Sequence, residues 1–182
     1  NDLIDKSNDK TVPLLILNNG NVIEESLDII HWALKNQKRD QKRIYFNQIY
    51  KKETYEMIHE NDQLFKYHLD RFKYETRFLG IDKEFHFLES LKLINKWNEI
   101  LNKNQKGDYW LIGGHESIAD WCLWPFVRQF KIACEQQKIP SPLKHPIKDW
   151  LKKFENNKNF KLIMRKYDVW RNNSDLKFFP EY

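Results

Sequence analysis

Residues 11–34 constrain the fold more than any other stretch of this chain of 182 residues. Pro13 opens a continuous apolar run at 14–17, as expected for a strand that is covered on both faces. Residues 18–20 are Asn, Asn and Gly, which tolerate the positive φ of a tight turn. A second short apolar run at 21–23 completes the pattern. The stretch therefore predicts a two-stranded hairpin.

A helix is predicted directly after the hairpin. Glu24, Glu25 and Ser26 precede it, and acidic residues suit this position because the unpaired amides and the dipole of a helix start favour negative charge. Its apolar residues are Leu27, Ile29, Ile30, Ala33 and Leu34. They predict a largely buried helix that ends near Asn36.

Most of the remaining chain is predicted to be helical. Long helices are expected at 43–69 and 83–103, and the short spacing between them implies antiparallel neighbours. Segment 70–80 is too irregular to assign. The candidate buried residues of the two helices are Ile44, Tyr45, Tyr50, Met57, Ile58, Leu64, Phe65, Leu69, Phe85, Leu88, Leu91, Ile94, Trp97, Ile100 and Leu101.

A capping box predicts the start of the central core helix. Ser117 can cap the free amides of a helix, while Asp120, three residues later, bonds back to the cap. Pro125 should bend or locally break this helix because it lacks a backbone donor. Short helices are expected near 147–154 and 160–164, and the aromatic tail 167–182 should pack back on the protein.

Composition excludes several classes of protein. No apolar run reaches the roughly 18 residues of a membrane span. The net charge of +5 comes from mixed acidic and basic residues, so a nucleic-acid-binding helical domain is only a third and weaker interpretation. Cys122 and Cys134 cannot form a disulfide framework and fit a reducing, cytoplasmic setting. The six histidines show no metal-binding spacing, and no metal is expected.

The order of these elements resembles the glutathione S-transferases. The matching pieces are Val12-Pro13 before a strand, Glu25-Ser26 at a helix start, and residues 117–120 at the start of the central helix. Residues 70–74 and 166–170 are most similar to a bacterial-type branch. The resemblance implies a mostly α fold, with part of a thioredoxin-like α/β domain at 1–37 and an all-helical C-terminal domain at 38–182.

The resemblance also implies a glutathione site. Val12, before a cis Pro13, would pair its backbone with the cysteinyl part of glutathione. Glu25 would bind the ammonium of the γ-glutamyl end, and Ser26 with the helix-start amides would bind its carboxylate. Taken singly, Pro13 fits an ordinary trans proline at a strand start, and Glu25 and Ser26 fit a simple helix cap.

The chain departs from the family before Thr11, where the first β-α-β unit has no counterpart. That unit carries the family's catalytic residue, so the catalytic residue stays unknown here. We expect the gene product to contain the missing unit, because an isolated hairpin is marginally stable.

The expected activity is that of a glutathione transferase, in which the thiolate attacks a small hydrophobic electrophile or reduces a disulfide. The alternative is a glutathione-fold binding or interaction module without turnover. Glutathione is the expected co-substrate, and a homodimer fits the family, although no self-complementary patch can be read. Four aromatic residues are open to two interpretations, an acceptor-pocket wall or core packing: Tyr50, Tyr55, Phe65 and Tyr67.

Overall fold

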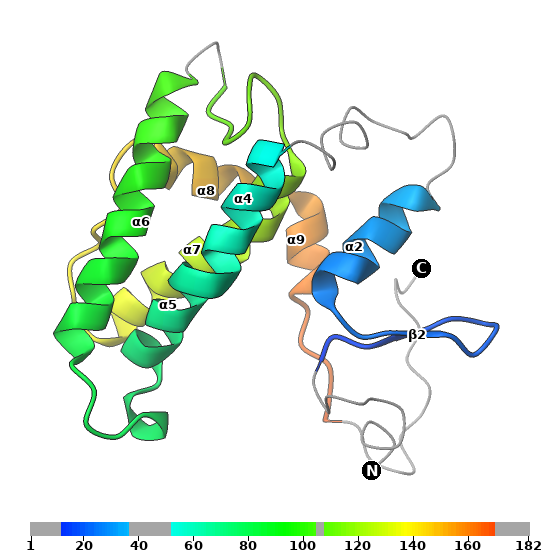
Figure 1. The fold of residues 1–182 in the computed structure, drawn as a ribbon, viewed down its shortest axis with the longest axis horizontal. Coiled ribbons are helices and arrows are strands. Elements are labelled where there is room, and N and C mark those ends of the chain that lie inside the picture. The colour runs from blue at the N-terminus through cyan, green and yellow to red at the C-terminus, as the bar shows by residue number, and fades with distance from the viewer. Residues whose placement is uncertain (1–11, 37–51, 105–107, 170–182) are drawn as a thin grey trace.

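The computed structural model describes residues 12–36, 52–104 and 108–169, and it is mostly helical (Figure 1). A small sheet and one helix stand beside a bundle of helices. No helix among these residues is long and apolar enough to cross a membrane. The elements are β1 (Leu15–Ile16), β2 (Val22–Ile23), α2 (Ser26–Lys35), α4 (Lys52–Glu60), the π-helical turn η2 (Asn61–Phe65), α5 (Lys66–Lys73), the 3-10 turn η3 (Glu75–Arg77), α6 (Lys83–Lys103), α7 (Ile118–Gln136), α8 (Ile147–Glu155) and α9 (Lys158–Ile163).

The predicted hairpin is present, but its strands are short. β1 and β2 pair antiparallel, with Leu15 opposite Ile23 and Ile16 opposite Val22. Gly20 adopts φ +84 in the turn, a conformation that favours glycine. The expectation that residues 14–17 form a strand covered on both faces is wrong for the described residues: only two residues pair, and the Ile16 side chain is 48% exposed. The reason is that β2 is the only described strand beside β1.

Helix α2 has the predicted bounds but not the predicted burial. It starts at Ser26, and Asn36 is its C-cap. Leu34 is its only buried residue, while Ala33 is exposed. The prediction of a largely buried helix is therefore wrong, because α2 turns one edge to the core and the opposite edge to solvent. Its half-buried apolar residues that contact the core are Leu27 and Ile30.

The first long helix contains a π-helical turn that was not predicted, and it continues past residue 69. Its described part starts at Lys52 and stays helical to Lys73, through α4, η2 and α5. A π-helical turn holds an extra residue, which rotates the residues beyond it around the axis. Leu64, predicted to be buried, lies in this turn and is 48% exposed. Ile44, Tyr45 and Tyr50 lie outside the described residues, as does the predicted domain boundary at residue 37, which stays a prediction.

Helix α6 spans residues 83–103, as predicted. It lies beside α5 and runs antiparallel to it (Figure 1). Its later turns are buried, including Ile94 and Trp97. Phe85 and Leu88 were also expected to be buried, and both are about half exposed, at 49% and 46%. Both lie on the solvent side of the first turns of α6, whose opposite side is covered, because His86 and Ser90 are buried there.

Helix α7 lies at the centre of the bundle and begins with the predicted capping box. The Asp120 carboxylate accepts hydrogen bonds from the Ser117 amide at 2.9 Å and from the Ser117 hydroxyl. Pro125 lies inside a helix that is continuous from Ile118 to Gln136, so it does not break the helix. The core of the bundle forms around α7, where Phe65 contacts both Trp97 and Phe130.

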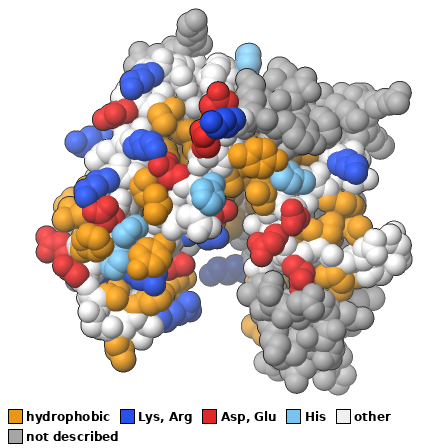
Figure 2. All heavy atoms as spheres, viewed as in Figure 1, with side chains coloured by type: hydrophobic (Ala, Val, Ile, Leu, Met, Phe, Trp, Pro, Cys, Tyr) orange, Lys and Arg blue, Asp and Glu red, His pale blue; other side chains and the backbone are white. Residues whose placement is uncertain are grey.

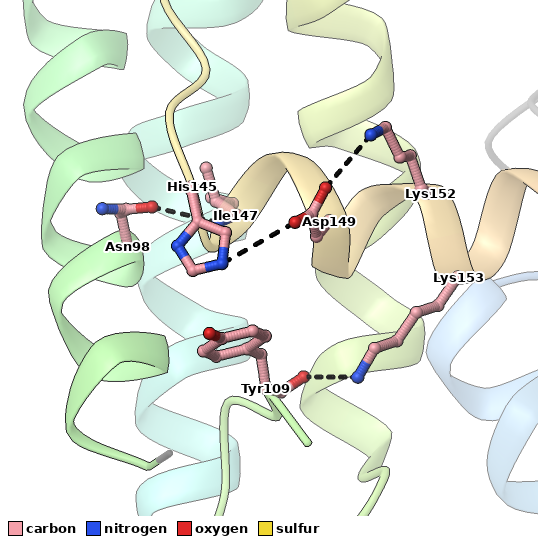
Figure 3. Close-up of polar contacts among 7 residues, drawn as sticks. All are labelled: Asn98, Tyr109, His145, Ile147, Asp149, Lys152 and Lys153. Carbon is pink, nitrogen blue, oxygen red and sulfur yellow. Dashed lines mark hydrogen bonds and ion pairs between the residues drawn. The ribbon is translucent and has the colours of Figure 1, made fainter. Parts of the chain in front are cut away.

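Helix α8 is tied to its neighbours by polar contacts (Figure 3). The Ile147 amide donates to Asn98 Oδ1 of α6 at 3.0 Å, and Lys153 donates to the Tyr109 carbonyl at 3.3 Å. Asp149 contacts Lys152 at 3.1 Å, and this hydrogen bond lowers the pKa of Asp149. The predicted helices near 147–154 and 160–164 correspond to α8 and α9. Most of the aromatic tail, residues 170–182, lies outside the described residues.

Candidate functional site

The four predicted site residues, Val12, Pro13, Glu25 and Ser26, lie at the open end of the hairpin. The register pairs Leu15 with Ile23. Continued outward in the same antiparallel sense, it aligns Pro13 with Glu25 and Val12 with Ser26. In Figure 1 the first described residues run beside the start of α2. The fold thus brings two segments that are separate in sequence to the same end of the hairpin.

The start of α2 leaves its polar side chains open. Glu25 is the N-cap residue, with extended backbone angles of φ −83 and ψ 136. Its carbonyl accepts from the Ile29 amide at 3.0 Å, but its carboxylate makes no capping hydrogen bond. Glu25 and Ser26 are both exposed. The side-chain cap required by the simpler interpretation is therefore not formed by Glu25.

The facing segment presents backbone at the same end. The peptide bond between Val12 and Pro13 is cis, and the Val12 side chain is 74% exposed. Figure 2 shows acidic side chains gathered beside the hairpin and the start of α2. Asp28 lies in the first turn of α2 and adds a carboxylate to that of Glu25. The site therefore combines a negative charge that suits an ammonium group with a helix start that suits an anion.

The aromatic residues separate into different environments. Tyr55 of α4 is 40% exposed, and its ring lies edge to face with the ring of His31 of α2, with 6.5 Å between the centroids. Phe65 is fully buried in the core. Tyr67 lies beside α6, where its ring is 5.8 Å from that of His86. Among the described residues, Tyr55 is therefore the member of this set that faces α2.

The two cysteines do not supply a reactive thiol. Both lie on α7, and Cys134 is fully buried. Burial, with a smaller contribution from the charge of Asp62, raises the pKa of Cys122 to about 12. Burial also raises the pKa of Cys134 to about 11, and the charge of Glu135 adds to this effect. A thiolate nucleophile needs a lowered pKa, so both cysteines are structural.

A separate cavity of about 580 Å³ lies between α4, α6 and residues 111–113. None of the predicted glutathione-binding residues lines it. Three glutamates on one face of α4 form part of its wall, and their helical spacing is the only sign of it in the sequence. Its lining residues are Glu53, Glu56, Met57, Glu60, Lys96, Ile100, Asn104, Leu111, Ile112 and Gly113. Within the described residues, no group of three or more metal-ligating side chains is present.

Several solved structures have a similar fold. Maleylpyruvate isomerase from Pseudomonas aeruginosa PAO1 matches with a TM-score of 0.59 and 16% identity, over 82% of this chain and 78% of that chain. A glutathione S-transferase from Rhodospirillum rubrum F11 matches with a TM-score of 0.59 and 14% identity, over 92% and 76%. A glutathione transferase from Phanerochaete chrysosporium, in complex with oxidized glutathione, matches with a TM-score of 0.63 and 16% identity, over 87% and 73%.

These matches define the class of fold. No protein-family model matches the sequence, and no curated protein matches it. The chain has the glutathione S-transferase fold. In this chain, part of the thioredoxin-like domain is followed by the helical domain. The resemblance read from residues 12–13, 25–26 and 117–120 is confirmed at the level of the fold.

Proposed function

We propose that the protein binds glutathione at the open end of the β1–β2 hairpin. The observation that carries this proposal is the exposed Glu25 carboxylate, which makes no capping bond although it stands at the start of α2. Support also comes from the fold, which is shared with a transferase solved in complex with oxidized glutathione. Glutathione suits this position because its γ-glutamyl end carries an ammonium and a carboxylate side by side.

Each residue has a distinct role in the proposed complex. The Val12 backbone pairs with the cysteinyl residue of glutathione in the manner of a neighbouring strand. Glu25 forms a charge-assisted hydrogen bond with the ammonium. Ser26 donates its hydroxyl to the carboxylate, which also meets the first amides of α2. The peptide part of glutathione is thereby fixed by both segments of the hairpin end.

The proposed reaction is transfer of the glutathione thiolate. The thiol loses its proton to solvent, and its sulfur forms a bond to an electrophilic carbon as the leaving group departs. With a disulfide, the sulfur bonds to one sulfur atom while the S–S bond breaks and the other sulfur leaves as a thiolate. A free thiol has a pKa of about 8.5, so the reaction needs a group that stabilises the thiolate. No described residue is assigned this role. A small hydrophobic electrophile, a cytoplasmic location and a homodimer stay predictions.

A second candidate function is glutathione binding without turnover. The observation that favours it is the state of the thiols: Cys122 and Cys134 have raised pKa values and lie on α7, away from the hairpin. A protein that binds glutathione and does not activate its sulfur would act as a binding or interaction module. Turnover of a model electrophile distinguishes the two functions.

Calorimetric titration with reduced glutathione and S-methylglutathione tests the binding site. We expect both ligands to bind, because the proposed contacts are to the peptide part. Loss of a hydrogen bond to a charged group costs about 1.5–3 kcal/mol, so Glu25→Ala should weaken binding roughly tenfold to a hundredfold. Ser26→Ala should weaken it less.

Glu99→Ala is the matched control for Glu25→Ala. Glu99 is an exposed glutamate of α6, so this variant removes the same charge far from the hairpin and should bind like the wild type. Equal affinity of the wild type and Glu25→Ala would contradict the proposed site. No binding of glutathione by the wild type would contradict the proposed function as a whole.

A further inference from the structure

Two histidines on neighbouring helices are in direct contact. His68 of α5 and His86 of α6 place their Nδ1 atoms 2.8 Å apart, within hydrogen-bond distance. Their rings are 5.0 Å apart between centroids and tilted by 44°. Figure 2 shows histidine side chains among hydrophobic ones over the end of the bundle where α5 and α6 lie. The contact therefore joins the two helices at the surface of the bundle.

Aromatic rings surround the pair but leave it accessible. The ring of Tyr67 lies 5.8 Å from that of His86, and the ring of Phe85 lies 5.8 Å from that of His68. Tyr67 and Phe85 are each about half exposed, and His68 is partly exposed, whereas His86 is only 7% exposed. Protons can reach His68 from solvent, yet the pair is partly withdrawn from water.

Only some protonation states permit this contact. With both imidazoles neutral, one Nδ1 donates its hydrogen and the other accepts it. With one imidazolium, the cation donates to the neutral ring in a stronger, charge-assisted bond. With both rings protonated, each Nδ1 carries a hydrogen, no acceptor is left, and two like charges lie side by side. The doubly protonated pair must therefore separate.

We propose that the His68–His86 contact is a pH-sensitive link between α5 and α6, which is closed while at most one ring is protonated and opens when both are. The charged groups around it differ in sign. Arg71 of α5 and Lys92 of α6 oppose protonation, while Asp82 and Glu89 of α6 favour it. The effects of these opposite charges on protonation partly cancel, and burial of the rings is the larger effect, which disfavours protonation.

The pKa values of both histidines agree with this balance. Burial lowers the pKa of His68, and the neighbouring His86 lowers it further. Burial also lowers the pKa of His86, with a second contribution from Arg71. A histidine with a lowered pKa in the folded state binds fewer protons than it does in the unfolded chain. Its contribution to stability is therefore present above the unfolded value of 6.5 and is lost as the pH falls through the folded value.

Urea unfolding of the wild type and two single variants between pH 8 and pH 5 tests the link. For each proton taken up on unfolding, the equilibrium constant for unfolding rises by up to about tenfold for every unit by which the pH falls. We expect this rise in the wild type below pH 6.5 and a smaller rise in His68→Gln. His59→Gln is the matched control, since His59 is an exposed histidine of α4, and it should follow the wild type. Identical pH dependence of wild type and His68→Gln would overturn the proposal.

A second measurement applies to the folded wild type and does not depend on a variant that folds well. Nuclear magnetic resonance of the imidazole C–H signals gives the titration of each ring. We expect His68 and His86 to titrate below 6.5, the ordinary histidine pKa, and the α5 and α6 amides near them to shift in the same pH range. Titration of both rings at or above 6.5, with no change at those amides, would overturn the proposal.

Discussion

Removal of the Asp120 carboxylate is the sharpest test of how the helical domain is held together. The Asp120 side chain is fully buried, and it joins three parts of the chain. Its Oδ1 accepts from the Leu111 amide at 2.9 Å and from Trp150 Nε1 at 2.7 Å. Its Oδ2 accepts from the amide and the hydroxyl of Ser117. One carboxylate therefore fixes the start of α7, the preceding loop and α8.

The magnitude follows from the donors that each variant leaves unpaired. Asp120→Ala leaves three buried N–H groups without an acceptor, and each costs about 1–3 kcal/mol. Local relaxation and entry of water reduce the sum, so we expect a loss of about 4 kcal/mol in the free energy of unfolding. Asp120→Asn keeps an acceptor for Leu111 and Trp150 but turns an NH₂ group toward Ser117, and should cost about 2 kcal/mol. Ser117→Ala removes only the cap hydroxyl and should cost about 1 kcal/mol.

Urea unfolding followed by circular dichroism at pH 7 measures these losses, provided that the dependence on urea concentration stays the same among the variants. Glu99→Ala, at an exposed position of α6, serves as a control and should stay within about 0.5 kcal/mol of the wild type. A loss below about 1 kcal/mol for Asp120→Ala would refute the reasoning, because buried unpaired donors cannot cost so little. So would a larger loss for Ser117→Ala than for Asp120→Ala.

Two further predictions concern α7 and α8. Because burial raises the pKa of Cys122 to about 12, its thiolate fraction should lie roughly a thousandfold below that of an exposed cysteine. Labelling with a maleimide at about pH 7.5 should therefore be slow in the folded protein and fast in urea. Fast labelling of the folded protein would contradict this prediction. Asn98→Ala removes the acceptor of the Ile147 amide shown in Figure 3 and should lower the free energy of unfolding by about 1 kcal/mol in the same urea assay, whereas Asn95→Ala, at an exposed position of α6, should not.

Local rules were enough to predict the features that depend on neighbouring residues. The capping box of Ser117 and Asp120 was predictable because both partners lie within one helical turn. The hairpin turn was predictable because Gly20 supplies the positive φ that it needs. The end of α2 at Asn36 followed from the end of the apolar pattern.

Tertiary features were less accessible from the sequence. Leu64, Phe85 and Leu88 occupy helical positions that fit a buried stripe, yet all three are about half exposed. Their exposure depends on the π-helical turn at 61–65 and on the extent to which neighbouring helices cover α6, and neither is encoded in local spacing. The partners of Asp120 beyond its own turn, Leu111 and Trp150, also come from distant parts of the sequence. The contact between His68 and His86 was missed for the same reason.

The starts of α6, α7, α8 and α9 help to interpret the candidate site. Asp82 caps α6 by accepting from the Phe85 amide, and Asn157 caps α9 by accepting from the Asn159 amide. The capping box serves α7, and Asn98 accepts from the first amide of α8.

Helix α2 differs from these four helices. Its N-cap residue Glu25 makes no side-chain bond of this kind. Glu25 is instead exposed at the open end of the hairpin, two residues beyond the last paired residue, Ile23. Because the Glu25 carboxylate does not cap the helix, we propose that it binds the ammonium group of a ligand. The first backbone amides of α2 would bind the carboxylate of the same ligand. The γ-glutamyl end of glutathione has this pair of groups, which is why the proposed site rests on the start of α2.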